Sequence, residues 1–65
     1  MKSYRDENRY IYKVVPLGTL LFGVVRTRSQ VRKIMFFFEP QGSEGDMQEK
    51  LDVYAKIQGW AEVPQ

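Results

Sequence analysis

With 65 residues and neither cysteine nor histidine, this chain has few ways to stabilise a fold. A domain of this size buries only about 60% of the surface that its unfolded chain exposes. Many small domains compensate with disulfides or a zinc site of the Cys/His type, and this chain can form neither. We therefore expect one domain that depends on close packing or on association with another chain.

Charge is distributed unevenly along the sequence, although the net charge is only +2. Residues 1–38 contain eight Lys or Arg and two acidic residues, whereas residues 39–65 contain two Lys and six acidic residues. A basic half and an acidic half can orient a partner molecule, or they can attract each other within one fold.

The sequence also predicts a compartment. Residues 1–9 are polar and do not resemble a signal peptide. The longest mostly apolar run, Leu17 to Val25, is far shorter than the roughly 20 residues that cross a bilayer. The lack of cysteine is typical of a reducing environment. We expect a cytoplasmic protein without a membrane partner.

Three segments have the β-branched and aromatic composition of strands: residues 10–15, 19–25 and 31–38. Pro16 and Gly18 predict a type I turn after the first segment, and the polar residues 26–30 predict a hairpin tip. Residues 28–38 also fit helical spacing, so strand and helix both remain open there. Three adjacent phenylalanines favour the strand.

A helix is expected over about residues 44–58. Ser43 can cap its N-terminus, with Asp46 three residues later. Gly59 stands where a left-handed residue commonly ends a helix. Trp60 can then fold back onto the helix, and the segment that begins there predicts a short last strand.

These elements predict an α+β fold, a small two-layer domain with one helix on an antiparallel sheet of three to four strands, in the order β-β-β-α-β. Residues 10–65 form the domain, and residues 1–9 are expected to be a flexible N-terminal arm. Neighbouring strand residues point to opposite faces, and both faces of this sheet are largely apolar. One helix covers only one face, although a strongly curled sheet or the arm could cover the other.

An uncovered apolar face indicates a protein-binding surface, for a second copy or for a different partner. The sequence does not tell which face the helix covers, so the predicted contacts are drawn from both faces. They are Tyr10, Tyr12, Phe22, Arg26, Arg28, Arg32, Phe36 and Phe37.

Sequence features of an enzyme are missing. Without His and Cys, the commonest general base and the thiol nucleophile are absent. The five glycines form no phosphate-binding loop. The carboxylates of the expected helix spread around it, which is typical of a solvated face rather than a metal site. We expect no catalytic residue, no cofactor and no metal.

Nucleic-acid binding is the alternative function. Arg26, Arg28, Arg32 and Lys33 cluster at the second predicted hairpin. Cations bind phosphates, and aromatic rings on a sheet can stack on bases. Arginine also anchors protein interfaces, so the same cluster suits a protein partner.

Two segments resemble a small uncharacterised domain family of bacteria and phages. Residues 10–15, Tyr-Ile-Tyr-Lys-Val-Val, match the Y-x-Y-K-V-V first strand of that family, and residues 59–63 match its G-W-x-E-V segment after a helix. In the family the helix follows the first strand closely, whereas here a predicted hairpin intervenes. The resemblance implies a similar α+β plan and a bacterial or phage origin, and it implies no activity.

Together these features predict a small, intracellular, non-enzymatic protein-binding module that acts through an apolar sheet face and a basic hairpin. An inhibitor encoded by a phage or mobile element, or an accessory subunit of a larger complex, is the kind of protein expected by analogy.

Overall fold

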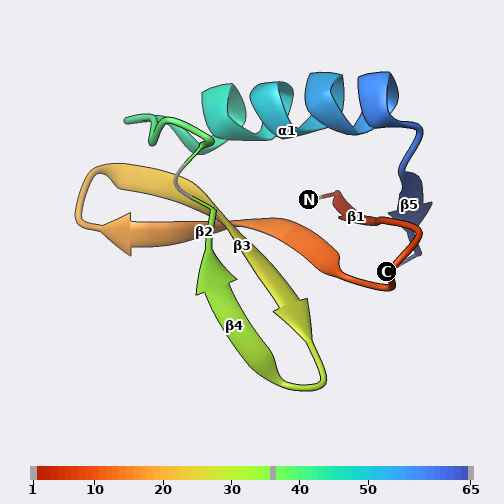
Figure 1. Ribbon diagram of the computed structural model, residues 1–65. Coiled ribbons are helices and arrows are strands. Elements are labelled where there is room, and N and C mark those ends of the chain that lie inside the picture. Colours follow the sequence, from red (N-terminus) through yellow and green to blue (C-terminus); the bar gives the residue numbers. More distant parts are fainter. Residues whose placement is uncertain (1, 36, 65) are drawn as a thin grey trace.

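The computed structural model describes residues 2–35 and 37–64, which form an antiparallel sheet with a helix packed on one face (Figure 1). The elements are β1 (Ser3–Arg5), β2 (Ile11–Gly18), β3 (Leu21–Arg28), β4 (Val31–Ile34), α1 (Glu44–Gln58) and β5 (Ala61–Val63). The strand order across the sheet is β4-β3-β2-β1-β5. The α+β class is confirmed, but the described chain has five strands, in the order β-β-β-β-α-β, rather than three to four.

The additional strand is β1, which lies in the segment expected to be a flexible arm. Tyr4 pairs with Tyr12 of β2 on one side and with Glu62 of β5 on the other. Its side chain is buried in the core, and its hydroxyl donates a 2.6 Å hydrogen bond to Asp52 of α1. Burial of one tyrosine between two strands and the helix therefore gives this short segment a place in the sheet.

The reversal between β3 and β4 is a two-residue turn. Ser29 and Gln30 both have left-handed backbones, with φ of 51° and 69°. Turns of this kind match the twist of antiparallel strands, so they are favoured in hairpins. The strand interpretation is therefore confirmed for Val31–Ile34, whereas the strand predicted to continue to residue 38 ends at Ile34.

The turn predicted at Pro16 is wrong. Pro16 lies within β2 opposite Phe22, and the register shifts between Pro16 and Gly18. Proline cannot donate a ladder hydrogen bond, and irregularities of this kind are where a sheet accommodates it. The chain reverses instead between Gly18 and Leu21.

Helix α1 begins and ends as predicted. The Ser43 hydroxyl accepts a 3.3 Å hydrogen bond from the Asp46 amide. Gly59 has a φ of 74°, the left-handed conformation of a helix cap. Trp60 folds back, and its ring stacks on Tyr12 at a centroid distance of 4.1 Å. In the part of the chain that the structure describes, no helix combines the length and the apolar character needed to span a membrane.

The core lies between α1 and the face of the sheet that the helix covers, here called the helix-side face. It consists of Tyr4, Tyr12, Val14, Val24, Met35, Phe38, Met47, Leu51 and Ala55. Met47, Leu51 and Ala55 lie along one side of α1, and each is fully buried. Along each strand, the residues that alternate with the core residues point to the opposite face of the sheet, which α1 does not cover.

Candidate functional site

The face of the sheet away from α1, here called the open face, carries an aliphatic patch. Alternation and strand register place aliphatic side chains of β2, β3 and β4 on it, among them Val15, Leu17, Leu21, Val25 and Ile34. Leu21 is 42% exposed and Ile34 is 38% exposed. Val25 is only 4% exposed, yet it is not part of the core cluster beneath α1. The open face thus has a buried floor of its own.

This floor belongs to a shallow hollow of about 370 Å³. The hollow is lined by Val15, Pro16, Leu17, Val25, Arg32, Lys33 and Ile34. Leu17 packs flat against the backbone of Gly23, where an added Cβ would lie 2.5 Å from the Leu17 Cδ1 atom. The glycine therefore lets an aliphatic side chain lie on the sheet and close one side of the hollow.

The strands that form the sheet are strongly basic. They contain six Lys or Arg and one acidic residue, Glu62. Glu62 is opposite Tyr4 and so lies on the helix side, whereas Arg5, Lys13 and Arg32 alternate onto the open face. Among residues 2–35 and 37–64, none of the six strand cations lies within ion-pairing distance of a carboxylate. The open face therefore combines an aliphatic patch with uncompensated positive charge.

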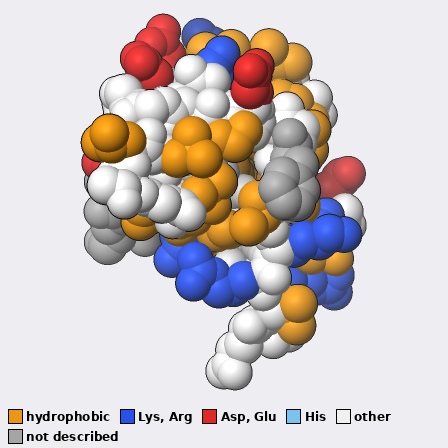
Figure 2. Space-filling model, turned by 90° about the vertical axis from the view of Figure 1, so that its left-hand side faces the viewer, with side chains coloured by type: hydrophobic (Ala, Val, Ile, Leu, Met, Phe, Trp, Pro, Cys, Tyr) orange, Lys and Arg blue, Asp and Glu red, His pale blue; other side chains and the backbone are white. Residues whose placement is uncertain are grey.

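Most acidic side chains lie at the other end of the molecule. Figure 2 shows acidic side chains gathered mainly at the top, over the helix, and basic side chains gathered mainly toward the bottom, with apolar side chains between them. The basic and acidic halves of the sequence therefore form two poles of one domain rather than a charge-paired interior. Such an arrangement orients a charged partner.

The β3–β4 hairpin carries a second basic surface, on its helix-side face. The Arg26 guanidinium lies over the Tyr10 ring at 4.1 Å from the centroid, and Arg28 lies at 5.2 Å from the same ring. These residues border a hollow of about 280 Å³ together with Ser29, Val31 and Lys33. Cation–π contacts with one ring hold both guanidinium groups near each other.

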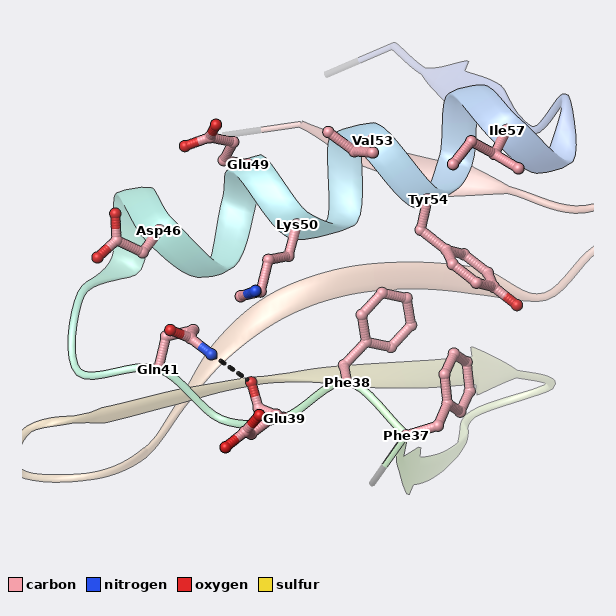
Figure 3. A pocket seen from close by; sticks show the side chains of 10 residues that line it. All are labelled: Phe37, Phe38, Glu39, Gln41, Asp46, Glu49, Lys50, Val53, Tyr54 and Ile57. Atoms are coloured by element: carbon pink, nitrogen blue, oxygen red, sulfur yellow. Dashed lines mark hydrogen bonds between the residues drawn. The ribbon is translucent and has the colours of Figure 1, made fainter.

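A larger hollow, of about 710 Å³, lies between α1 and the segment that precedes it (Figure 3). Phe37, Phe38 and Tyr54 point toward one another in it, with ring centroids 4.5 to 5.5 Å apart. Val53 and Ile57 of α1 extend the apolar lining. Its charged lining is mixed: Glu39, Asp46, Glu49 and Lys50. This helix-side hollow is therefore apolar but has no single charge sign.

The predicted contact residues do not form one surface. Tyr12 is 5% exposed, and its hydroxyl donates a 2.9 Å hydrogen bond to Asp6. Burial and this hydrogen bond raise the pKa of Tyr12. Phe22 packs against the core and is partly buried. Both rings therefore serve the fold beneath α1 and are poor candidates for direct contact with a partner.

The remaining predicted residues are split among three places. Tyr10, Arg26 and Arg28 meet on the helix-side face of the β3–β4 hairpin, and Arg32 lies on the open face. Phe37, 62% exposed, lies in the hollow beside α1. Phe36 lies outside the described residues.

Sequence reasoning missed the residues of the open-face patch. Val15, Leu17 and Ile34 are not among the predicted contacts, because aromatic side chains and arginines are the residue types that most often anchor interfaces. The available signal was the alternation of side chains along the strands. Tyr12 and Phe22 share the face that α1 covers, and the alternate positions carry aliphatic side chains next to Lys13 and Arg32.

Within the described part of the chain, no three side chains of the metal-ligating types come together as a group. Comparison of the chain with protein-family models, with curated proteins and with solved structures gives no match. The resemblance of residues 10–15 and 59–63 to the bacterial and phage family therefore stays a prediction.

Proposed function

We propose that this protein is a non-enzymatic binding module whose open face docks on another protein with an acidic, apolar surface. The observation that carries the proposal is the uncovered aliphatic patch around Val25, bordered by Lys13 and Arg32 and free of acidic residues at the described strand positions. Exposed apolar patches with a polar rim mark interaction sites. The charge of the rim selects a partner of opposite sign and speeds its encounter.

The chemistry of the patch favours a protein over a nucleic acid. Single-stranded nucleic acids bind by stacking their bases on flat aromatic rings. The open face offers the branched side chains Val15, Leu17 and Ile34 instead, while Tyr12 and Phe22 lie on the helix side. Tyr10 retains some exposure, but two arginines lie over its ring. Nucleic-acid binding through the basic hairpin is therefore the alternative outcome of the test.

The test is capture of partners from an extract of the source cells by wild-type protein and two matched variants. Ile34→Asp places a carboxylate on the open face, and Ile57→Asp places one in the helix-side hollow; both side chains are exposed, so both variants should fold. We expect wild type and Ile57→Asp to retain one and the same protein, and Ile34→Asp to lose it.

Other results of this experiment contradict the proposal. Loss of the captured protein with Ile57→Asp alone would assign binding to the hollow lined by Phe37 and Tyr54. Capture that nuclease treatment abolishes would establish the nucleic-acid alternative. Retention of the captured protein by both variants would exclude the open face and the helix-side hollow as the binding site.

Self-association is tested separately by light scattering of the untagged protein. Because the open face carries Arg5, Lys13 and Arg32, two copies that met through this face would bring like charges together. We expect a monomer. A dimer that Ile34→Asp dissociates would show that the open face binds a second copy rather than an acidic partner.

A further inference from the structure

We infer that the partner contributes an extended, acidic segment that pairs with the outer edge of β4 and so adds a strand to the sheet. This inference rests on the proposed function and specifies how the partner is held. β4 is an edge of the sheet, and all four of its residues, Val31–Ile34, are exposed. Addition of a strand to an open edge is a common mode of peptide recognition.

The backbone of β4 presents two residues to such a strand. The Met35 amide donates a 2.8 Å hydrogen bond to the Val24 carbonyl, just beyond the pairs that β3 and β4 form. Bonded and non-bonded pairs alternate along an antiparallel ladder. Continuing that alternation, Arg32 and Ile34 direct their backbone N–H and C=O groups away from β3. These two residues are therefore the attachment points for a partner strand.

The side chains of β4 select the charge of that strand. Arg32 lies on the open face and Lys33 lies on the helix-side face, so both faces of the edge are basic. Opposite charges in cross-strand pairs stabilise pairing, and like charges oppose it. A strand with acidic residues opposite Arg32 and Lys33 therefore fits this edge on both faces.

The same charges argue against a second copy as the occupant. If two β4 strands pair about a two-fold axis over their length, either Lys33 or Arg32 stands opposite its own counterpart. Either register brings like charges into direct cross-strand contact. A different chain with carboxylates avoids this repulsion.

Hollows flank β4 on both faces of the sheet. Ile34 and Arg32 border the hollow over Val25 on the open face. Val31 and Lys33 border the hollow with Tyr10, Arg26 and Arg28 on the other face. A strand along this edge would send alternate side chains toward the two hollows, so we expect apolar residues opposite Ile34 and carboxylates near the two arginines.

Charged residues on an edge strand can also serve only to prevent aggregation. The two roles differ in what they predict for an acidic peptide. Edge protection requires no ordered pairing with any chain, whereas strand addition requires hydrogen bonds at Arg32 and Ile34 in one register. A test of the backbone contacts therefore separates them.

The probe is a capped synthetic peptide with Glu opposite Arg32 and Lys33 and with Val opposite Val31 and Ile34. Its binding to the full chain is followed by NMR amide shifts and hydrogen exchange, at peptide concentrations up to about 1 mM, where weak peptide binding is still measurable. A peptide with Lys in place of Glu is the control for charge. Two further peptides are N-methylated, one at the amide opposite Arg32 and one at the amide opposite Lys33.

We expect the acidic peptide to bind and to protect the Arg32 and Ile34 amides from exchange. Methylation opposite Arg32 should abolish binding, because that amide faces β4, whereas methylation opposite Lys33 should leave it unchanged. Arg32→Glu should weaken binding about tenfold by turning attraction into repulsion. Lys50→Glu, a charge reversal on α1 away from the sheet edge, is the matched control and should bind as wild type does.

Equal binding of both methylated peptides would overturn strand addition and leave the open-face proposal standing. Failure of the acidic peptide to bind better than the Lys peptide would also overturn the inference; the capture experiment with Ile34→Asp would then decide the proposed function independently. Binding of a single-stranded oligonucleotide at β4, without binding of the peptide, would overturn both.

Discussion

Leu51→Ala should remove a large part of the stability of this domain. Leu51 lies at the centre of α1, is fully buried and belongs to the core beneath the helix. The substitution removes three carbon atoms, which corresponds to about 2.4 kcal/mol of transfer free energy. The cavity left behind raises the expected loss to about 3–5 kcal/mol. A domain of this length has about 3–10 kcal/mol of stability in total, so the variant should be close to unfolding.

The assay is urea denaturation followed by the fluorescence of Trp60, whose ring stacks on Tyr12 only in the folded chain. With a slope of about 1 kcal/mol per molar urea for a small protein, the midpoint should fall by about 3 M or more. Ile57→Ala is the matched control on the same helix. Ile57 is 73% exposed, and alanine is the better helix former, so its midpoint should stay within about 0.5 M of wild type. Equal midpoint shifts in the two variants would refute the assignment of the covered helix face.

Two further predictions concern single contacts. Burial, the hydrogen bond to Asp52 and nearby negative charge raise the pKa of Tyr4 to about 12. Below pH 10 the phenol is protonated in both the folded and the unfolded chain, so the stabilisation from Tyr4 is complete. From about pH 10 to pH 12 only the unfolded chain ionises, and the free energy of unfolding should decline. Tyr4→Phe should flatten this part of the curve of stability against pH, measured by urea titration. Gly59→Ala should cost about 1 kcal/mol in the same assay, because Gly59 has a φ of 74°, whereas Gly18→Ala, in open space and without a left-handed backbone, should cost less. No decline in wild-type stability above pH 10, the same decline in Tyr4→Phe as in wild type, or equal losses from the two glycine variants would contradict these assignments.

The helix could be predicted because its signals are local. Ser43 and Asp46 lie within one turn of each other, and Gly59 directly follows the last helical residue. The same holds for the return of Trp60 onto the helix, which follows from the left-handed cap. Such contacts depend on residues near in sequence, so they can be recognised without knowledge of the rest of the fold.

Strand β1 could not be predicted, because its partners are distant in sequence. Only Ser3–Arg5 form it, among polar neighbours, and Tyr4 is buried through contacts with Tyr12, with Glu62 and with Asp52. β5 is equally short, but the Gly59 helix cap just before it indicates where a new element begins, whereas no such local signal adjoins β1. β1 forms only once β2, β5 and α1 are in place to contact it.

The composition of the candidate surface was predictable only in part. Alternation showed that both sheet faces are apolar, and the basic character of the second hairpin was visible in Arg26, Arg28 and Arg32. The sequence did not show which face of the sheet α1 covers, because a helix can pack on either face when both are apolar. Large aromatic rings favour the prediction of a contact with a partner, whereas Tyr12 is buried and stacks on Trp60.

A photoreactive amino acid at position 34 gives the most direct test of the claim that the open face binds an acidic protein. The same residue at position 57, in the helix-side hollow, is the control, and crosslinking is carried out in the source cells. We expect crosslinks from position 34 to a protein other than this chain, at a segment rich in Asp or Glu, and no such product from position 57. Crosslinks from position 34 to a second copy or to nucleic acid, or protein crosslinks from position 57 alone, would contradict it.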